Sequence, residues 1–119
     1  MKNCISISSL IPSFKNKLNM PGDKSLSIRW ILLASQAIGK SKAFNLLESE
    51  DVINAISSMK KLGVKIIKKN SFYEITGVGL NGFKYKKGLI LNAGNSGTLG
   101  RLIAGLLVHS KEKIIIKGD

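Results

Sequence analysis

The residues Pro21-Gly22-Asp23-Lys24-Ser25-Leu26-Ser27-Ile28-Arg29 place a turn, a helix start and two cations within one short stretch. Pro followed by Gly suits the central positions of a type II turn, because proline presets φ and glycine accepts a positive φ. Ser25 is then a favoured N-cap for an apolar helix that begins at Leu26. Backbone N–H groups, a hydroxyl and the Lys24 ammonium would meet at that helix end, and such an arrangement binds anions. The same residues would also fit an ordinary capped helix beside a solvated lysine. This stretch alone therefore does not establish an anion-binding site.

A second glycine-rich turn lies further along the chain, in Leu91-Asn92-Ala93-Gly94-Asn95-Ser96-Gly97-Thr98-Leu99-Gly100-Arg101. A strand pattern precedes it and a helical pattern follows, so backbone N–H groups would again gather at a helix N-terminus. Asn95 can donate to an oxyanion there, Ser96 or Thr98 can cap the helix, and Arg101 adds a cation. The spacing matches neither a Walker P-loop nor G-x-G-x-x-G. The two turns together favour a small phosphorylated or carboxylated ligand, with a nucleotide-binding module as a weaker alternative.

Length and composition bound the class of protein. The chain has 119 residues, of which 44% are hydrophobic, so it can form one modest domain with a core. Its net charge of +12 suits anionic ligands. Arg29 and Arg101 are its only arginines, whereas a basic nucleic-acid-binding module would carry more arginine and more aromatic residues placed for stacking. That module therefore remains the less favoured alternative from a different class.

Single cysteine and histidine residues limit the chemistry further. Cys4 alone excludes an internal disulfide and offers no pair of metal ligands. His109 is expected in the last turn of a helix, with a surface role. No apolar run reaches membrane-spanning length, and the N-terminal residues are too polar for a signal peptide. We therefore expect a cytoplasmic protein that uses no metal.

Hydrophobic periodicity predicts a mixed α/β (α+β) chain in the order β-β-α-β-α-β-β-β-α-β. Glu50 and Asp51 are interpreted as residues that favour a helix start, because acidic side chains suit the first turn. The predicted helices are Leu26–Ile38, with Gly39 at C′, a helix from the Ser49 cap to Gly63, and Thr98–Ser110. The predicted strands are Cys4–Leu10, Lys17–Met20, Ala43–Leu47, Val64–Lys69, Phe72–Thr76, Leu89–Asn92 and Lys113–Lys117, with a loop from Gly77 to Gly88.

Three motifs resemble the EPSP synthase (3-phosphoshikimate 1-carboxyvinyltransferase) family. The stretch 21–29 resembles its Pro-Gly-(Ser/Asp)-Lys-Ser-x-Ser-x-Arg signature, and residues 45–52 resemble its Asn-Leu-Leu-x-Ser-x-Asp-Val segment. Residues 94–98 match its Gly-Asn-(Ser/Ala)-Gly-Thr loop. Order and spacing agree over nearly the whole chain. Gly118-Asp119 resembles the start of a further family segment, so we expect an N-terminal piece of roughly a quarter to a third of the enzyme.

The resemblance implies transfer of the enolpyruvyl group of phosphoenolpyruvate to shikimate 3-phosphate in chorismate and aromatic amino acid biosynthesis. By similarity, Lys24 would be catalytic and touch both substrates. Ser25 and Arg29 would bind shikimate 3-phosphate, and Asn95 and Gly97 would face phosphoenolpyruvate. The family needs no metal or organic cofactor, has no nucleic-acid or membrane partner, and its full-length enzyme is expected to be a monomer.

The family fold has two domains built from βαβαββ units, in an inside-out barrel that this chain would leave incomplete. Residues 1–20 would belong to the domain that the C-terminal half completes, and residues 21–119 would begin the N-terminal domain. The family's acidic residues for catalysis lie beyond Asp119, so we expect this chain alone to be inactive. UDP-N-acetylglucosamine enolpyruvyltransferase is a poorer match, because its motif has Lys-Asn where this chain has Lys24-Ser25.

Overall fold

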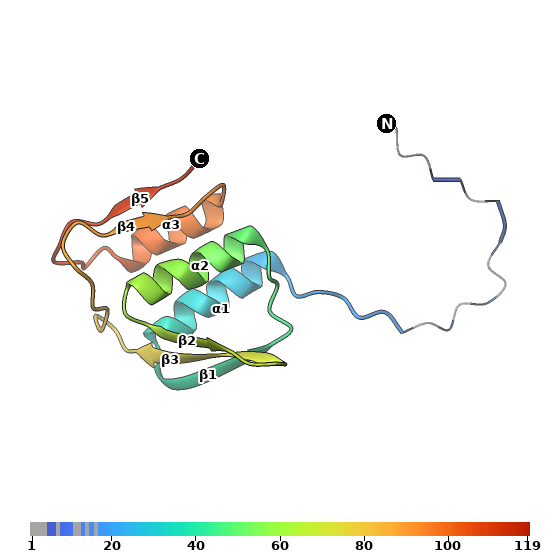
Figure 1. Ribbon diagram of the computed structural model, residues 1–119, viewed down its shortest axis with the longest axis horizontal. Coiled ribbons are helices and arrows are strands. Elements are labelled where there is room, and N and C mark those ends of the chain that lie inside the picture. The colour runs from blue at the N-terminus through green and yellow to red at the C-terminus, as the bar shows by residue number, and fades with distance from the viewer. Residues whose placement is uncertain (1–4, 7, 11–12, 14, 16) are drawn as a thin grey trace.

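The computed structural model describes residues 5–6, 8–10, 13, 15 and 17–119. The predicted mixed α/β class is confirmed, with sheets that are not closed (Figure 1). The elements in chain order are α1 (Lys24–Gln36), β1 (Ile38–Phe44), α2 (Glu50–Lys61), β2 (Lys65–Lys68), β3 (Phe72–Val78), β4 (Ile90–Asn92), α3 (Gly97–Leu106) and β5 (Ile115–Lys117).

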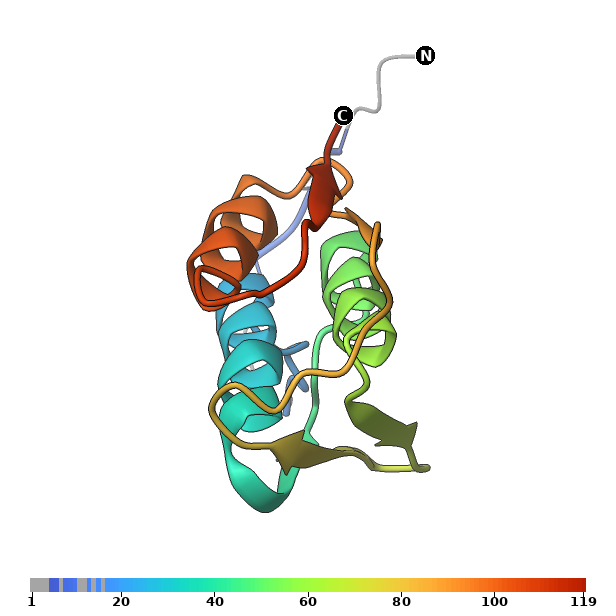
Figure 2. The same cartoon turned by 90° about the vertical axis from the view of Figure 1, so that its left-hand side faces the viewer.

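The three helices lie between two small sheets. One sheet has the strand order β1-β3-β2 with antiparallel pairing, and the other pairs β4 with β5 in parallel. Figures 1 and 2 both show α1 and α2 side by side, with the three-stranded sheet on one side and α3 with the β4–β5 pair on the other. The fully buried side chains that join these layers include Ile28, Ile31, Val52, Met59, Ile75, Leu99 and Ile103.

The three helices point in the same direction. Their N-terminal ends lie along one edge of the molecule, and their C-terminal ends lie along the opposite edge (Figure 1). The N-terminus of a helix carries a partial positive charge and unsatisfied N–H groups. One edge of the molecule is therefore favourable to anions, and the opposite edge is not.

Helical spacing orients the buried faces of α1 and α2, although Ile38, expected at the end of the first helix, lies in β1 and is exposed. In α2, Val52, Ile56 and Met59 are buried, and Gly63 ends the helix region with a φ of +87°. In α1, Ile28 and Ile31 are buried, in line with a helix that packs on both α2 and β3. An apolar residue every three or four positions is enough to orient such helices, because only one stripe of each can face the core.

The predicted start of α1 is wrong in two respects. Asp23, not Ser25, is the N-cap, and its Oδ1 accepts a hydrogen bond from the Leu26 N–H at 2.7 Å. Gly22 does not adopt a positive φ, so it forms no type II turn. It is needed for space instead, because a Cβ there would lie 2.2 Å from the carbonyl oxygen of Asn45. The chain entering α1 and the chain leaving β1 therefore pass in close backbone contact.

The end of α1 and the next strand also differ from prediction. The helix ends at Gln36, and Gly39 belongs to β1 with a φ of +95° instead of capping the helix. The strand predicted at Ala43–Leu47 begins earlier, at Ile38, because β3 provides a partner along its whole length. Its half-buried residues, Ser41 and Ala43, are small, and its largest apolar residues, Ile38 and Phe44, are exposed, so no alternation of large apolar residues marks the whole strand.

Pairing decides the remaining differences. Lys17–Met20 is not a strand. The Met20 carbonyl accepts a hydrogen bond from the side-chain amide of Asn45, at 2.9 Å, and not from the backbone of a neighbouring strand. The predicted strand Cys4–Leu10 lies partly outside the described residues, and those described within it are not in a strand. The β2–β3 hairpin is confirmed, although β3 continues to Val78. Helix α3 ends at Leu106 instead of Ser110, which leaves His109 exposed beyond the helix.

Candidate functional site

Ser27 joins the start of α1 to the segment that leads into α2. Its hydroxyl donates to the Asp23 carbonyl at 2.6 Å and accepts from the Leu47 N–H at 3.1 Å. The side chain is buried, with 5% of its surface exposed. The sequence marked Ser27 only as part of a motif; its position on the buried face of the helix was the signal that it is structural. It fixes the approach of α2 to α1.

Lys24 is the first residue of α1, a position that is unfavourable for a cation because of the helix dipole. Its ammonium forms an ion pair with the Asp51 carboxylate, at 3.0 Å between Nζ and Oδ2. The Lys24 side chain is 53% exposed, whereas that of Asp51 is 17% exposed. Asp51 lies in the first turn of α2, so the ion pair connects two helix N-termini.

Ser25 and Arg29 occupy the same side of α1, one helical turn apart. Ser25 is half-buried and Arg29 is exposed. With Lys24 they give the first turns of α1 a hydroxyl and two cations that solvent can reach. The structure therefore brings together the three residues predicted for shikimate 3-phosphate.

The second glycine-rich turn is built largely as predicted. The Asn92 side-chain oxygen accepts from the Gly94 N–H at 2.9 Å, and Gly94 has a φ of +54°. Ser96 caps α3, because its hydroxyl oxygen accepts from the Leu99 N–H at 3.3 Å. Asn95 and Gly97 are both exposed beside the first turn of α3. A Cβ built on Gly97 would meet nothing within 4 Å, so this backbone is open to a ligand.

A shallow hollow of about 330 Å³ lies against this turn. The end of β5 forms its other side, and the Asp119 N–H donates to the Gly94 carbonyl at 3.2 Å. Lys117 and Asp119 were missed by sequence reasoning, since no local pattern indicates that β5 ends beside β4. The residues around the hollow include Asn95, Gly97, Gly100, Arg101, Lys117 and Asp119.

The first turns of α2 connect the two glycine-rich stretches. Asp51 contacts Lys24, and the side-chain amide of Asn54 lies under the second turn, 2.6 Å from where a Cβ on Gly94 would be. Lys24 does not line the hollow beside Asn95. The two groups of predicted residues thus share one edge of the molecule without sharing one pocket.

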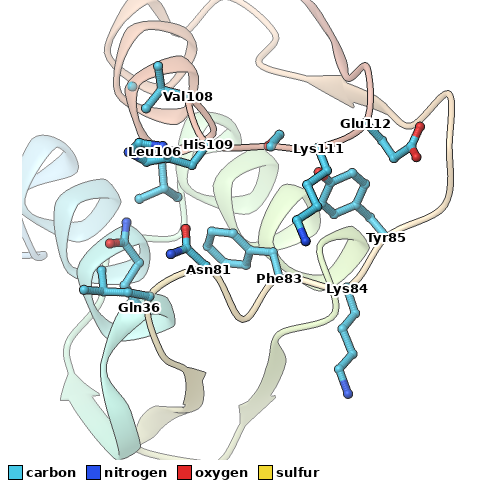
Figure 3. A pocket seen from close by; sticks show the side chains of 13 residues that line it. Gln36, Asn81, Phe83, Lys84, Tyr85, Leu106, Val108, His109, Lys111 and Glu112 are labelled. Atoms are coloured by element: carbon cyan, nitrogen blue, oxygen red, sulfur yellow. The ribbon is translucent and has the colours of Figure 1, made fainter.

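A larger cavity, of about 1050 Å³, lies at the opposite edge (Figure 3). Phe83 and Tyr85 line it together with Gln36 and Leu106, which are the last residues of α1 and α3. Carbonyl groups end both helices there, and their dipoles disfavour an anion. Lys84 and Lys111 also line this cavity, but the helix ends there present carbonyl groups, whereas the opposite edge combines cations with the N–H groups of helix starts and is the better anion site.

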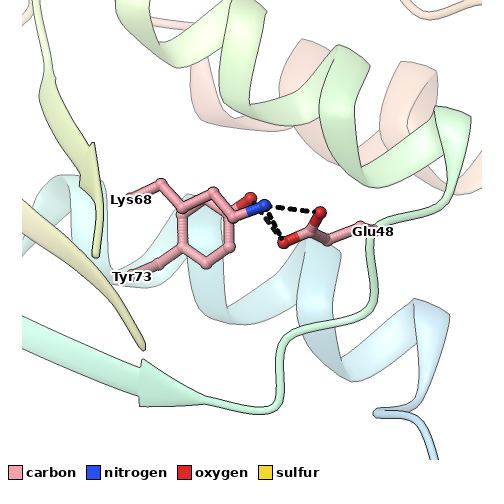
Figure 4. Close-up of polar contacts among 3 residues, drawn as sticks. All are labelled: Glu48, Lys68 and Tyr73. Atoms are coloured by element: carbon pink, nitrogen blue, oxygen red, sulfur yellow. Dashed lines mark hydrogen bonds and ion pairs between the residues drawn. The ribbon is translucent and has the colours of Figure 1, made fainter. Parts of the chain in front are cut away.

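A second lysine–carboxylate cluster lies on the hairpin side of α2 (Figure 4). The Glu48 carboxylate accepts from Lys68 Nζ at 2.7 Å and from the Tyr73 hydroxyl at 3.0 Å. The Lys68 hydrogen bond, with that of Tyr73, lowers the pKa of Glu48. Burial and the hydrogen bond to Glu48 raise the pKa of Tyr73. The cluster ties the segment before α2 to the β2–β3 hairpin.

Among the described residues, no three His, Cys, Asp or Glu side chains gather closely enough to hold a metal ion. None of the described helices, α1 to α3, has the length and apolar character needed to cross a membrane. What the edge offers is N–H dipoles and cations, which bind and orient anions.

Comparison with known proteins gives consistent matches. A family model described as EPSP synthase (3-phosphoshikimate 1-carboxyvinyltransferase) matches residues 11–119. A curated 3-phosphoshikimate 1-carboxyvinyltransferase from Vesicomyosocius okutanii subsp. Calyptogena okutanii (strain HA) is 47% identical over 108 residues, covering 90% of this chain and 24% of that protein. An EPSP synthase structure from Acinetobacter baumannii is 38% identical with a TM-score of 0.77, covering 90% of this chain and 24% of its own. A second structure of EPSP synthase from that organism gives the same identity and TM-score. The chain therefore spans about a quarter of the length of these relatives.

Proposed function

This chain belongs to the EPSP synthase family, and from that premise we propose that it supplies one side of a site that transfers the enolpyruvyl group of phosphoenolpyruvate to shikimate 3-phosphate. The products would be 5-enolpyruvylshikimate 3-phosphate and phosphate. The observation that carries the proposal is the common N-terminal edge of α1, α2 and α3, where the motif residues of both glycine-rich stretches lie.

Lys24 is the residue that we propose to contact both substrates. It is the first residue of α1, and its ammonium pairs with Asp51 in the first turn of α2. Ser25 and Arg29 would then bind the phosphate of shikimate 3-phosphate through a hydroxyl and a guanidinium group. Asn95 and the open backbone of Gly97 would face phosphoenolpyruvate beside the start of α3. Shikimate 3-phosphate would thus lie beside the start of α1, and phosphoenolpyruvate beside the start of α3.

The electrostatics of the edge suit this chemistry. Both substrates carry several negative charges, so bringing them together requires cations and N–H dipoles that offset their repulsion. Lys24 and Arg29 lie on α1, and Arg101 lies on α3, each within reach of a helix start. Addition of the substrate hydroxyl to the double bond of the enol phosphate also needs a proton donor for the methylene carbon and a base for the hydroxyl proton, before a proton and phosphate leave to give the enol ether product. We place those groups in the part of the family's length that this chain does not cover.

A chimera tests the proposal. Residues 1–119 would replace the corresponding segment of the Vesicomyosocius okutanii relative, and the product would be assayed for phosphate release and for growth of a bacterial strain that lacks this activity. We expect measurable turnover, because 47% identity and the common helix edge should preserve the site. Chimeras that fold, as judged by circular dichroism, but neither turn over nor support growth would contradict the proposal. The chain on its own is expected to be inactive.

We further propose small-molecule substrates, no nucleic-acid partner and a cytoplasmic monomer. The net charge of +12 is spread mainly over lysines, which is consistent with anionic metabolites at one edge. A salt titration of binding to single-stranded RNA tests this directly. Tight binding that weakens steeply with salt would favour a nucleic-acid-binding module instead.

A further inference from the structure

We propose that Asp51 is a positioning residue that holds the Lys24 ammonium at the common N-terminal edge of the three helices. Asp51 does not touch substrate in this proposal; it acts through Lys24. The inference rests on the proposed function of Lys24, and its test below separates the two.

The two side chains of the Lys24–Asp51 ion pair differ in how far they are exposed to solvent. Lys24 Nζ lies 3.0 Å from Asp51 Oδ2, with the lysine side chain 53% exposed and the aspartate side chain 17% exposed. The carboxylate is therefore enclosed by the protein, and the lysine side chain lies mostly in solvent. A lysine stem has several rotatable bonds and loses rotamer entropy when its end is fixed. Asp51 selects one of the positions that this stem could otherwise reach.

The polarity of the helices gives the ion pair a reason to exist. Lys24 lies at the N-terminus of α1, where the dipole disfavours a cation, and Asp51 lies at the N-terminus of α2, where the dipole favours an anion. The Asp51 carboxylate thus compensates the unfavourable interaction between the Lys24 cation and the dipole of its own helix. Such a compensated violation is expected where a residue is retained for function instead of for helix stability.

Hydrogen bonds at Leu47 and Glu48 hold the segment that leads to Asp51. The Ser27 hydroxyl accepts from the Leu47 N–H, and Glu48 is tied to Lys68 and Tyr73, so the segment before α2 is held on both sides. Asp51 follows directly in the first turn of α2. Its position relative to α1 is therefore set by the fold and not by Lys24.

The geometry leaves Lys24 available for a ligand. An ammonium group has three N–H donors, and one carboxylate oxygen at 3.0 Å engages one of them. The remaining donors lie on a side chain that is more than half exposed at the anion-binding edge. Asp51 thus orients the ammonium without burying it, which is the preorganisation that transition-state stabilisation requires.

The test uses the chimera described above with Asp51→Asn and, as a matched control, Glu50→Gln. Glu50 is exposed in the same helical turn and carries the same charge, so its loss changes the α2 dipole equally without touching Lys24. We expect Asp51→Asn to lower kcat by about tenfold to a hundredfold while KM for phosphoenolpyruvate changes by less than about threefold. The lysine charge stays in place, and only its orientation is lost. Glu50→Gln should leave both parameters within about twofold.

Two further variants distinguish positioning from a structural role. Asp51→Glu should restore kcat to within about fivefold, since a carboxylate returns to the same turn. In a Lys24→Ala background, Asp51→Asn should change the residual turnover by less than about twofold, because the residue that it positions is gone. Equal losses of kcat in Asp51→Asn and Glu50→Gln would overturn the inference, and so would independent effects of Lys24→Ala and Asp51→Asn.

A readout without turnover separates this inference from the proposed function. An amine-reactive reagent would label the folded chimera, and mass spectrometry would report the modified fraction at Lys24. We expect labelling at Lys24 to rise several-fold in Asp51→Asn and to stay unchanged in Glu50→Gln, because the 3.0 Å ion pair engages the Lys24 amine and a neutral amide in place of the carboxylate would not hold it as strongly. Equal labelling in all three proteins would overturn the inference. The turnover of the unsubstituted chimera reports on the proposed function alone.

Discussion

Two lysine–carboxylate pairs flank the start of α2, and they differ in what they hold. Glu48 meets Lys68 on the hairpin, with both side chains about half exposed, and Tyr73 completes the cluster. Asp51 meets Lys24 at the helix edge, with the carboxylate mostly buried and the lysine reaching out to solvent. The first pair joins a connecting segment to a sheet, and the second holds a cation between the N-termini of α1 and α2.

The comparison shows why an ion pair alone does not mark a site. Exposure does not separate the two lysines, because the Lys24 side chain is 53% exposed and the Lys68 side chain 57%. They differ in partners and in place: Lys68 contacts both the Glu48 carboxylate and the Tyr73 ring, 5.8 Å from its centroid, whereas Lys24 pairs with one carboxylate at the N-termini of α1 and α2. A cation beside the N–H groups of helix starts can bind an anionic ligand together with them, whereas Lys68 joins two parts of the fold.

The largest expected difference between the two pairs is in turnover. In the chimera, Lys24→Ala should lower kcat/KM by about a hundredfold to a thousandfold, because a cation between two anionic substrates is lost. Lys68→Ala should stay within about threefold, since it loses an exposed ion pair that joins the hairpin to the segment before α2. Steady-state kinetics measure both, and circular dichroism checks the fold. If both substitutions lowered kcat/KM to a similar extent, the assignment of Lys24 to ligand binding and of Lys68 to structure would be contradicted.

A smaller effect is expected where the two pairs depend on the same backbone. Gly22→Ala would place a Cβ 2.2 Å from the Asn45 carbonyl oxygen and push away the segment that carries Glu48 and Asp51. We expect a loss of about 1–3 kcal/mol in the free energy of unfolding, measured by urea denaturation. Gly105→Ala is the matched control, because its Cβ meets nothing within 4 Å in a helix that favours alanine. An unchanged midpoint for Gly22→Ala would show that the close approach is not required.

The smallest expected effect is a change in the pKa of Tyr73, which is hydrogen-bonded to Glu48. The pKa of Glu48 is lowered, so the stability that it contributes is present above pH 4.5 and is lost as pH falls through its lowered pKa. The pKa of Tyr73 is raised, so its contribution is present below pH 10.0 and is lost as pH rises through the raised value. Nuclear magnetic resonance of labelled tyrosine in a Tyr85→Phe variant would follow Tyr73 alone. Glu48→Gln should lower the Tyr73 pKa and Asp51→Asn should not, and equal shifts would contradict the separation of the two pairs.

Much of the site was predictable because its signals are local. Lys24, Asn95 and Gly97 lie in motifs whose turn chemistry depends on adjacent residues, and the structure places them at helix starts. The cap of α1 was assigned to Ser25 instead of Asp23, because both residue types are good caps and only the backbone selects one. Gly22 was assigned to a turn, because close approach to a distant carbonyl leaves no local trace.

The sequence by itself determined most of the helix faces, the hairpin, a turn capped by Ser96 or Thr98 and the family resemblance. Those features depend on periodicity and short motifs, which neighbouring residues fully specify. Only the tertiary structure decided that Asp51 pairs with Lys24, that Ser27 connects α1 to Leu47, and that β1 begins at Ile38. Each of these joins residues that are distant along the chain. Their partners are fixed by the packing of whole helices and strands, and no local pattern carries that information.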